Sequence, residues 1–246
     1  MVSPVLTTSY LYIGVIMGKK IEEINYYKSY GIPETLKVGA VTYKIIFPYT
    51  FNEDSSYIGL HEFDTLTIKL GIMSPSHQSA MLPKQRIQES LIHEMIHAIE
   101  TIFCDSLFTE EEVERLSMAW HSILTENDLH IRNNNKCMPK KVKIFSFYYD
   151  IKFVEFNDIE DQSICSSNAC TIHMADSVRL MSTQLQKMLL IYMLNCLIDR
   201  AFDMRFVDER KEGLNKVFKC FSSGFYQVLY ENDLERVLRC KKCGMR

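Results

Sequence analysis

The sequence predicts an α+β fold built from two tandem copies of one small unit. In each copy we expect a mixed or antiparallel sheet packed on a motif helix and a returning helix. Two observations support this prediction. Stretches rich in β-branched and aromatic residues precede long apolar helical patterns, and this order of segments occurs twice along the 246 residues. About 100 residues remain for each copy, which is close to the usual size of a domain.

The composition is that of an ordinary globular protein. A formal net charge of −3 gives no general attraction to nucleic acid or to anionic lipid, and we expect neither as a partner. The apolar run at residues 10–17 is too short to cross a bilayer, and no Lys or Arg precedes it, as a signal peptide would require. Eight irregularly spaced cysteines do not resemble a disulfide scaffold. We therefore expect reduced thiols and a cytoplasmic location.

Residues 1–32 are predicted to be an N-terminal appendage with an amphipathic helix at 19–30, which Gly31 ends. The first unit, residues 33–132, then begins with strand-like segments at 36–41 and 42–47. A polar turn follows at 52–56, and residues 57–61 and 65–70 are typical of a hairpin.

Two helical patterns complete the first unit. The motif helix is expected at 83–103, and Asp105 with Ser106 should break it. Thr109 and Glu112 then have the spacing of a capping box, with Thr109 as N-cap. The returning helix that they begin should end before Asn127. Its predicted apolar face comprises Val113, Leu116, Trp120, Ile123 and Leu124.

After a polar linker at 133–136, the second unit, residues 133–246, repeats the order of the first. A strand-like stretch covers 142–153. Without gaps, residues 38–47 align with 144–153, and 67–68 with 171–172. Farther along, Ile99-Glu100 aligns with Ile198-Asp199, and 126–129 with 231–234. Short matches that stay in order indicate an internal duplication.

The motif helix carries the most specific chemical signal, the H-E-x-x-H sequence of His93, Glu94 and His97. Residues four apart share a helix face, so the two imidazoles can bind one metal ion. Glu94 is then placed to act as a general base. The alternative is a core helix with two hydrogen-bonded histidines. An ionisable Glu94 inside an apolar helix argues against it, because an unpaired buried charge is costly.

The second unit lacks these residues. His93 aligns with Tyr192, Glu94 with Met193 and His97 with Cys196, when Ile99 is aligned with Ile198. We therefore expect a structural or substrate-binding role for the second unit.

A catalytic zinc usually has three protein ligands and one open position. Glu110 is the favoured third ligand, because it shares a helical face with Val113, which should point inwards. Glu111 is the next candidate, while Glu112 already has the capping role. His121 is a rival, since an antiparallel helix pair can bring it level with His93. These alternatives stay open.

Residues 36–129 resemble the zinc metallopeptidases of the H-E-x-x-H kind whose third ligand is Glu. They are most similar to the ImmA/IrrE-like and SprT-like versions carried by phages and mobile elements. In that group the third ligand begins a Glu-x-x-x-Asp/Asn pattern, which here corresponds to Glu110 and Glu114. Glu114 departs from the pattern, because Asp or Asn is usual there.

The resemblance implies a Zn²⁺ ion held by His93, His97 and Glu110. It also implies hydrolysis of a peptide bond in a peptide or protein substrate, with Glu94 as the base. If residues 67–70 formed a sheet edge, they could bind the substrate as an added strand. His121 and Tyr57 are candidate oxyanion donors. The competing hypothesis is a phage or mobile-element binding protein that uses the scaffold to grip a host or regulatory protein.

Cys240 and Cys243 form half of a zinc-knuckle pattern near the end of the sequence. A second C-x-x-C pair is missing, and Cys165 with Cys170 is the nearest substitute. Two thiols in a tail are the simpler interpretation.

Overall fold

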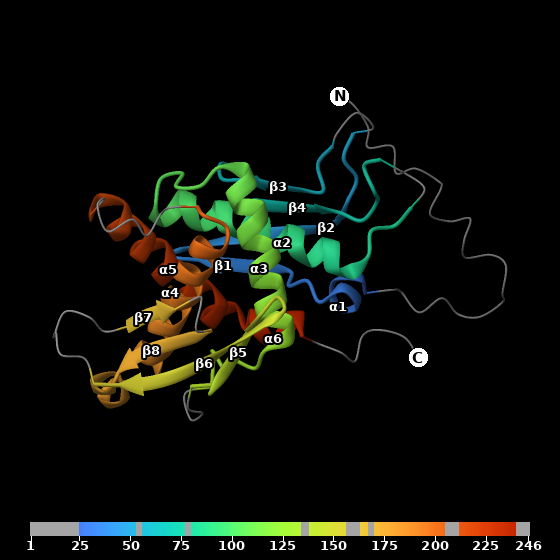
Figure 1. Ribbon diagram of the computed structural model, residues 1–246. Coiled ribbons are helices and arrows are strands. Elements are labelled where there is room, and N and C mark those ends of the chain that lie inside the picture. The colour runs from blue at the N-terminus through green and yellow to red at the C-terminus, as the bar shows by residue number, and fades with distance from the viewer. Residues whose placement is uncertain are drawn as a thin grey trace.

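The computed structural model describes residues 25–52, 56–76, 80–133, 138–155, 163–166, 170–204 and 212–239. Their fold is α+β, as predicted: two four-stranded sheets are accompanied by helices (Figure 1). Several predicted features lie outside these residues. They are the appendage before residue 25, the middle of the turn at 52–56, most of the 133–136 linker, and Cys240 with Cys243.

The first half contains one sheet and the two predicted helices. Its elements are α1 (Tyr26–Tyr30), β1 (Thr35–Val38), β2 (Val41–Tyr49), β3 (Gly59–Glu62), β4 (Thr67–Gly71), α2 (Lys84–Phe103) and α3 (Glu110–Glu126). The strand order is β1-β2-β4-β3. β2 and β4 are parallel, and the other neighbouring strands are antiparallel.

The hairpin expected in the first half is confirmed as β3 and β4, but its edge is not where the sequence placed it. Residues 67–70 lie in β4, which is an inner strand because it pairs with β2 as well as β3. The parallel pairing with β2 covers the side of β4 that was expected to be free. β3 is the edge strand instead.

The second half repeats the order of four strands followed by two long helices, and has two further short helices in addition. Its elements are β5 (Lys141–Ile144), β6 (Phe147–Val154), β7 (Ser163–Ser166), β8 (Thr171–Ala175), the 3₁₀ helix η2 (Asp176–Leu180), α4 (Thr183–Ala201), α5 (Glu212–Asn232) and α6 (Leu234–Leu238). The stretch at 142–153 is two strands joined by a turn, with Phe145 at φ 53°. The strand order β5-β6-β8-β7 matches that of the first sheet.

The pairing registers of the two sheets also correspond. Ile45 pairs with Ile68 in the first sheet, and Ile151 pairs with Ile172 in the second. These are residues that the sequence comparison had aligned. A common origin of the halves stays a prediction, and so do the domain boundaries at 32/33 and 132/133.

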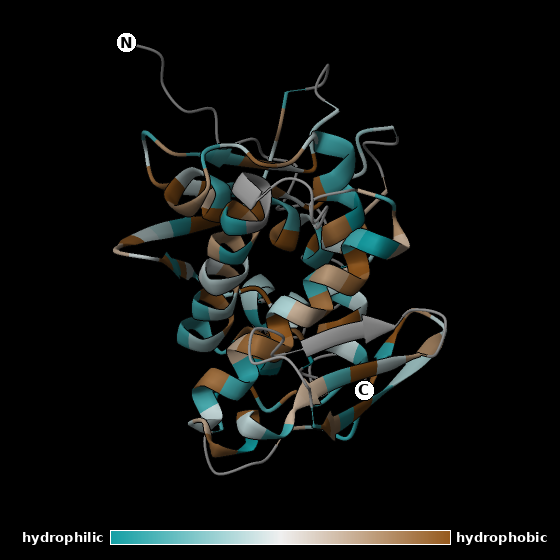
Figure 2. Cartoon of the chain, turned by 60° about the vertical axis from the view of Figure 1, so that its left-hand side comes forward, coloured by the Kyte–Doolittle hydropathy of each residue, from teal (hydrophilic) through white to brown (hydrophobic). Residues whose placement is uncertain are grey.

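Helix α2 lies against its own sheet and is apolar where it does so. Six apolar residues of this helix are inaccessible to solvent: Ile87, Leu91, Ile92, Met95, Ile96 and Ile99. The predicted apolar face of α3 is buried in the same way. Figure 2 shows helices that carry both hydrophilic and hydrophobic residues. Burial of the hydrophobic faces is the main contribution to their packing.

The second long helix of each half, α3 or α5, contacts the first strand of the other half. At the end of α3, Asn127 accepts a hydrogen bond from the backbone N–H of Lys143 in β5 (2.6 Å) and donates one to its carbonyl (2.7 Å). At the end of α5, Asn232 makes the same two bonds with Lys37 in β1, both at 2.8 Å. Each side-chain amide thus pairs with the backbone of a strand edge in the other half.

Two ion pairs follow the same exchange. Glu126 pairs with Lys143, and Glu231 pairs with Lys37. Because the halves exchange helix contacts in this way, the predicted tandem packing, in which each sheet packs on its own motif helix and returning helix, is not confirmed.

Across the described residues, no helix has both the length and the apolar content needed to cross a lipid bilayer.

Candidate metal centre

The turn between α2 and α3 brings the predicted site together. Cys104 follows the last residue of α2, and Asp105 and Ser106 adopt positive φ angles of 56° and 58°, which reverse the chain. Thr109 then begins α3 with the predicted capping box: its hydroxyl accepts from the Glu112 N–H, and the Glu112 carboxylate accepts from the Thr109 N–H. Glu110, the first residue of α3, therefore faces the last turns of α2.

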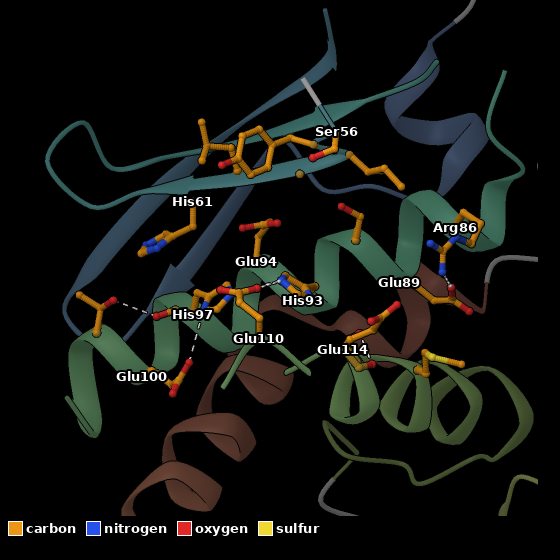
Figure 3. A pocket seen from close by; sticks show the side chains of 18 of the residues that line it. Ser56, His61, Arg86, Glu89, His93, Glu94, His97, Glu100, Glu110 and Glu114 are labelled. Atoms are coloured by element: carbon orange, nitrogen blue, oxygen red, sulfur yellow. Dashed lines mark hydrogen bonds and ion pairs between the residues drawn. The ribbon is translucent and has the colours of Figure 1, made fainter. Parts of the chain in front are cut away.

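Three side chains converge at this point, as Figure 3 shows. The Nε2 atoms of His93 and His97 are 3.1 Å apart. Glu110 Oε2 lies 3.3 Å from His93 Nε2, and Glu110 Oε1 lies 3.4 Å from His97 Nε2. Within the described part of the chain, these three residues form a group of donors that fits a metal ion.

The spacing of these donors suits a tetrahedral ion. Zinc binds imidazole nitrogen and carboxylate oxygen at about 2.0–2.2 Å, which places neighbouring ligand atoms of a tetrahedron about 3.3 Å apart. The two imidazole nitrogens are 3.1 Å apart, and each has a different oxygen of Glu110 at 3.3 or 3.4 Å, so all these separations are close to this value. Two imidazoles and one carboxylate are also a common donor set of catalytic zinc.

Glu94 extends from α2 towards β3, beside the two histidines (Figure 3). Its residue is only 6% exposed. Gly59 in β3 makes this position available: a Cβ atom at Gly59 would lie 2.4 Å from Glu94 Oε1 and 2.4 Å from Ser90 Oγ. The strand can approach the helix this closely only because residue 59 has no side chain.

The surroundings of Glu94 suit a base that works near neutral pH. Burial raises the pKa of its carboxyl to about 7, while the charge of His97 and a hydrogen bond from the His61 backbone N–H act in the opposite direction. A pKa near the working pH favours both acceptance and release of a proton.

The two histidines differ in their electrostatic environment. Burial lowers the pKa of His93, and the neighbouring His97 lowers it further. Burial also acts to lower the pKa of His97. A hydrogen bond with Glu100 and the nearby carboxylates of Glu94 and Glu110 outweigh burial, so the pKa of His97 is raised.

The side chains surround a pocket of about 680 Å³ between β3, α2 and α3. Edge strand β3 forms one wall with Gly59, Leu60 and His61, and Tyr57 lies just before it at 60% exposure. Glu114 and Met118 of α3 contribute to the lining. The pocket therefore joins the donor cluster to an open strand edge.

The rival ligands lie elsewhere. Glu111 pairs with Arg115, and Glu112 is held in the capping box. His121 is buried, with Nε2 3.1 Å from Gln88 Oε1. Because α3 runs back along α2, residue 121 reaches the level of Gln88 and not that of His93. His121 thus lies outside both the donor cluster and the pocket lining, and Glu110 is the residue that joins the histidines.

Sequence reasoning missed Glu100, the carboxylate that supports His97. Its Oε2 lies 3.3 Å from His97 Nδ1. Glu114, which departs from the pattern of the resembling family, makes no hydrogen bond to either histidine in the described chain. The available signal was an acidic residue three positions after His97, next to the apolar residues Ala98 and Ile99.

The corresponding part of the second half is a packed core. Asn195, on the turn that aligns with the motif, is fully buried. It accepts a hydrogen bond from Trp120 Nε1 (2.7 Å) and donates one to Ser222 Oγ (2.9 Å). Cys196 is buried as well, and burial raises the pKa of its thiol to about 12. At the positions where α2 carries the candidate metal donors, α4 therefore carries residues that pack against α3 and α5.

Comparisons with protein-family models, with curated proteins and with solved structures give no match to this chain.

Proposed function

We propose that the protein is a zinc-dependent metalloendopeptidase whose active residues all belong to the first half. The observation that carries this proposal is the convergence of His93, His97 and Glu110, whose ligand atoms lie within 4.8 Å of one another, with the buried carboxylate of Glu94 beside them. A metal-free core helix would have no need to place two imidazoles and a carboxylate of another helix around one point.

The chain's own residues suit peptide hydrolysis. His93, His97 and Glu110 would hold the ion, which when bound supplies a Lewis acid that makes water more acidic. Glu94 accepts a proton from the attacking water at its carboxylate and passes it to the amine that leaves. Its burial keeps bulk water away from the proton transfer.

The substrate is proposed to bind as an extended peptide along β3. This strand pairs with β4 on one side, and none of the described strands lies on its other side. Residues 59–61 line the pocket, so a peptide added at this edge would pass the donor cluster. Backbone hydrogen bonds from β3 would bind the substrate peptide whatever its side chains. The pocket would then select among the side chains of the substrate.

Zinc binding is tested first, by elemental mass spectrometry of the purified protein and of the His93→Ala variant. We expect one zinc per chain in the wild type and a loss of zinc in the variant. Zinc that persists in His93→Ala would place the metal elsewhere, and Cys240 with Cys243 would become the next pair to replace.

Hydrolysis is tested with a peptide library and the Glu94→Gln variant. Loss of a general base should slow cleavage by about 10²–10⁴-fold while zinc stays bound, because Glu94 is not a ligand. Wild-type cleavage by Glu94→Gln would contradict the proposal. Zinc binding without any cleavage would favour the binding-protein alternative, in which the scaffold grips a host or regulatory protein. Whether the protein cleaves a peptide or only binds a partner, we propose a cytoplasmic location and a phage or mobile-element context. This proposal follows the resemblance to ImmA/IrrE-like and SprT-like proteins.

A further inference from the structure

Glu100 is a buried carboxylate with partners from two different parts of the fold. The residue is 3% exposed. Its Oε2 lies 3.3 Å from His97 Nδ1, and its Oε1 accepts a hydrogen bond of 2.6 Å from the Phe108 backbone N–H. A carboxylate is expensive to bury unless such partners compensate it, so this arrangement has to be maintained whenever the chain is folded.

The first partner determines which nitrogen of His97 carries the proton. An ionised carboxylate only accepts hydrogen bonds, so Nδ1 must donate. Nε2 then keeps its lone pair and faces His93 and Glu110. An outer carboxylate of this kind sets the tautomer and orientation of a metal-binding imidazole.

The second partner determines where the third donor lies. Phe108 stands two residues before Glu110, and its ring packs on Phe221 of α5, with 4.8 Å between ring centres. The hydrogen bond from Phe108 to Glu100 holds this end of the turn against α2. It therefore fixes the start of α3, from which Glu110 reaches the two histidines.

We propose that Glu100 is a positioning residue that sets two of the three metal donors at once: His97 through its tautomer, and Glu110 through the turn before α3. This inference rests on the proposed metal centre. It adds a residue that couples the two helices of that centre.

The Glu100→Gln substitution separates positioning from simple structural support. A glutamine keeps one carbonyl oxygen, which can still accept from the Phe108 N–H. Its NH₂ group would then face His97 Nδ1 and would need an acceptor there. The substitution should therefore preserve the turn. It should favour the tautomer of His97 with the proton on Nε2, and in that tautomer Nε2 has no free lone pair for a metal ion.

The experiment compares wild type, Glu100→Gln and Glu89→Gln by zinc competition with a chromophoric chelator. Glu89 is a matched control, since it is a buried carboxylate of α2 at 8% exposure that pairs with Arg86. We expect zinc affinity to fall by about 10–100-fold in Glu100→Gln and to stay at the wild-type level in Glu89→Gln. Thermal unfolding without metal should be similar in the three proteins.

Nitrogen-15 NMR of the histidine rings gives a readout that needs no metal. In alkaline solution, where the imidazole is neutral, His97 should carry its proton on Nδ1 in the wild type and on Nε2 in Glu100→Gln. An unchanged tautomer, or unchanged zinc affinity in Glu100→Gln, would overturn the inference. A wild type with the expected tautomer but no zinc binding would instead overturn the proposed metal centre.

Discussion

A single missing side chain has a large effect at the site. Gly59 allows β3 to lie so close to α2 that the carboxylate of Glu94 is enclosed between strand and helix. The enclosure raises the pKa of Glu94 to about 7, chiefly through burial. The pKa of Glu94, the proposed base, therefore depends on a residue of a different element, β3.

Gly59→Ala should disturb this arrangement without removing a donor. The added Cβ would lie 2.4 Å from both Glu94 Oε1 and Ser90 Oγ, so the strand or the carboxylate must move. We expect peptide cleavage to fall by about 10²-fold, as misplacement of a catalytic group by an ångström does, while zinc content stays near one per chain. Steady-state kinetics and metal analysis check both.

The control for Gly59→Ala is Gly71→Ala, because Gly71 lies in β4 of the same sheet and a Cβ atom there would come no closer than 3.3 Å to its neighbours. Wild-type cleavage by Gly59→Ala would show that the close approach of β3 has no role in placing Glu94.

His61 should make stability depend on pH. Burial, together with the nearby charge of His97, lowers the pKa of its imidazole from 6.5 to about 4, and its buried Nε2 has no hydrogen-bond partner within the described part of the chain. Between these two pH values the unfolded chain binds a proton that the folded chain does not. Stability should therefore fall as the pH drops from 6.5 towards 4, and this contribution should level off below 4.

Urea unfolding of the metal-free protein and of His61→Gln measures the effect. Because His61 is only partly buried, we expect it to account for about 1–2 kcal/mol of the pH-dependent loss. The variant should show a correspondingly shallower fall in the free energy of unfolding. Parallel curves for the two proteins would contradict the shifted pKa.

At the level of elements, the two halves are joined by equivalent side chains at the ends of α3 and α5. Asn127 binds the backbone of Lys143, and Asn232 binds the backbone of Lys37. Both asparagines also donate to a carbonyl of their own helix, four residues earlier. Each one therefore ends a helix and pairs with a strand edge.

Replacement of the two asparagines should have unequal costs. Asn127→Ala leaves backbone groups of β5 unpaired at a buried position, and we expect a loss of about 1–3 kcal/mol in the free energy of unfolding. Asn232→Ala affects groups that water can reach, and the expected loss is about 0.5–1 kcal/mol. Chemical denaturation of both variants tests this order. A larger loss in Asn232→Ala than in Asn127→Ala would show that burial of the hydrogen-bonded groups does not determine the cost.

The sequence predicts the helices and strands themselves better than it predicts which of them lie side by side. The spacing of His93 and His97 and the capping box of Thr109 are local patterns, and local patterns are read directly from the chain. The parallel pairing of β2 with β4 is not local, so the edge was assigned to the wrong strand of the hairpin. Glu100 was missed for a similar reason, since its partner Phe108 reaches it only after the turn has formed.

For the whole molecule, the exchange of helices makes the second half part of the first half's core. Trp120 of α3 is inaccessible to solvent, and its ring lies 4.5 Å from that of Phe225 in α5. Gly224 brings α5 close to the end of α2: a Cβ there would lie 2.6 Å from the Phe103 ring. The turn that delivers Glu110 is thus supported by α5.

A chain that ends at residue 132 should therefore lose the site even though it contains every proposed ligand. Without α4 and α5, the apolar face of α3 around Trp120 would be exposed, and we expect no cooperative folding and no bound zinc. Circular dichroism and metal analysis check this, and co-expression of residues 133–246 should restore both. A folded monomer of residues 1–132 with one zinc would contradict the dependence.

The paired contacts of Asn127 and Asn232 are those that two identical short chains would form across a twofold axis. In such a dimer, dilution would separate the partners, and the site would disappear with them. Within one chain the partner is always at hand, because the tether holds its effective concentration high. The site should consequently stay assembled at any protein concentration, and one half is free to change its interior while it continues to support the other.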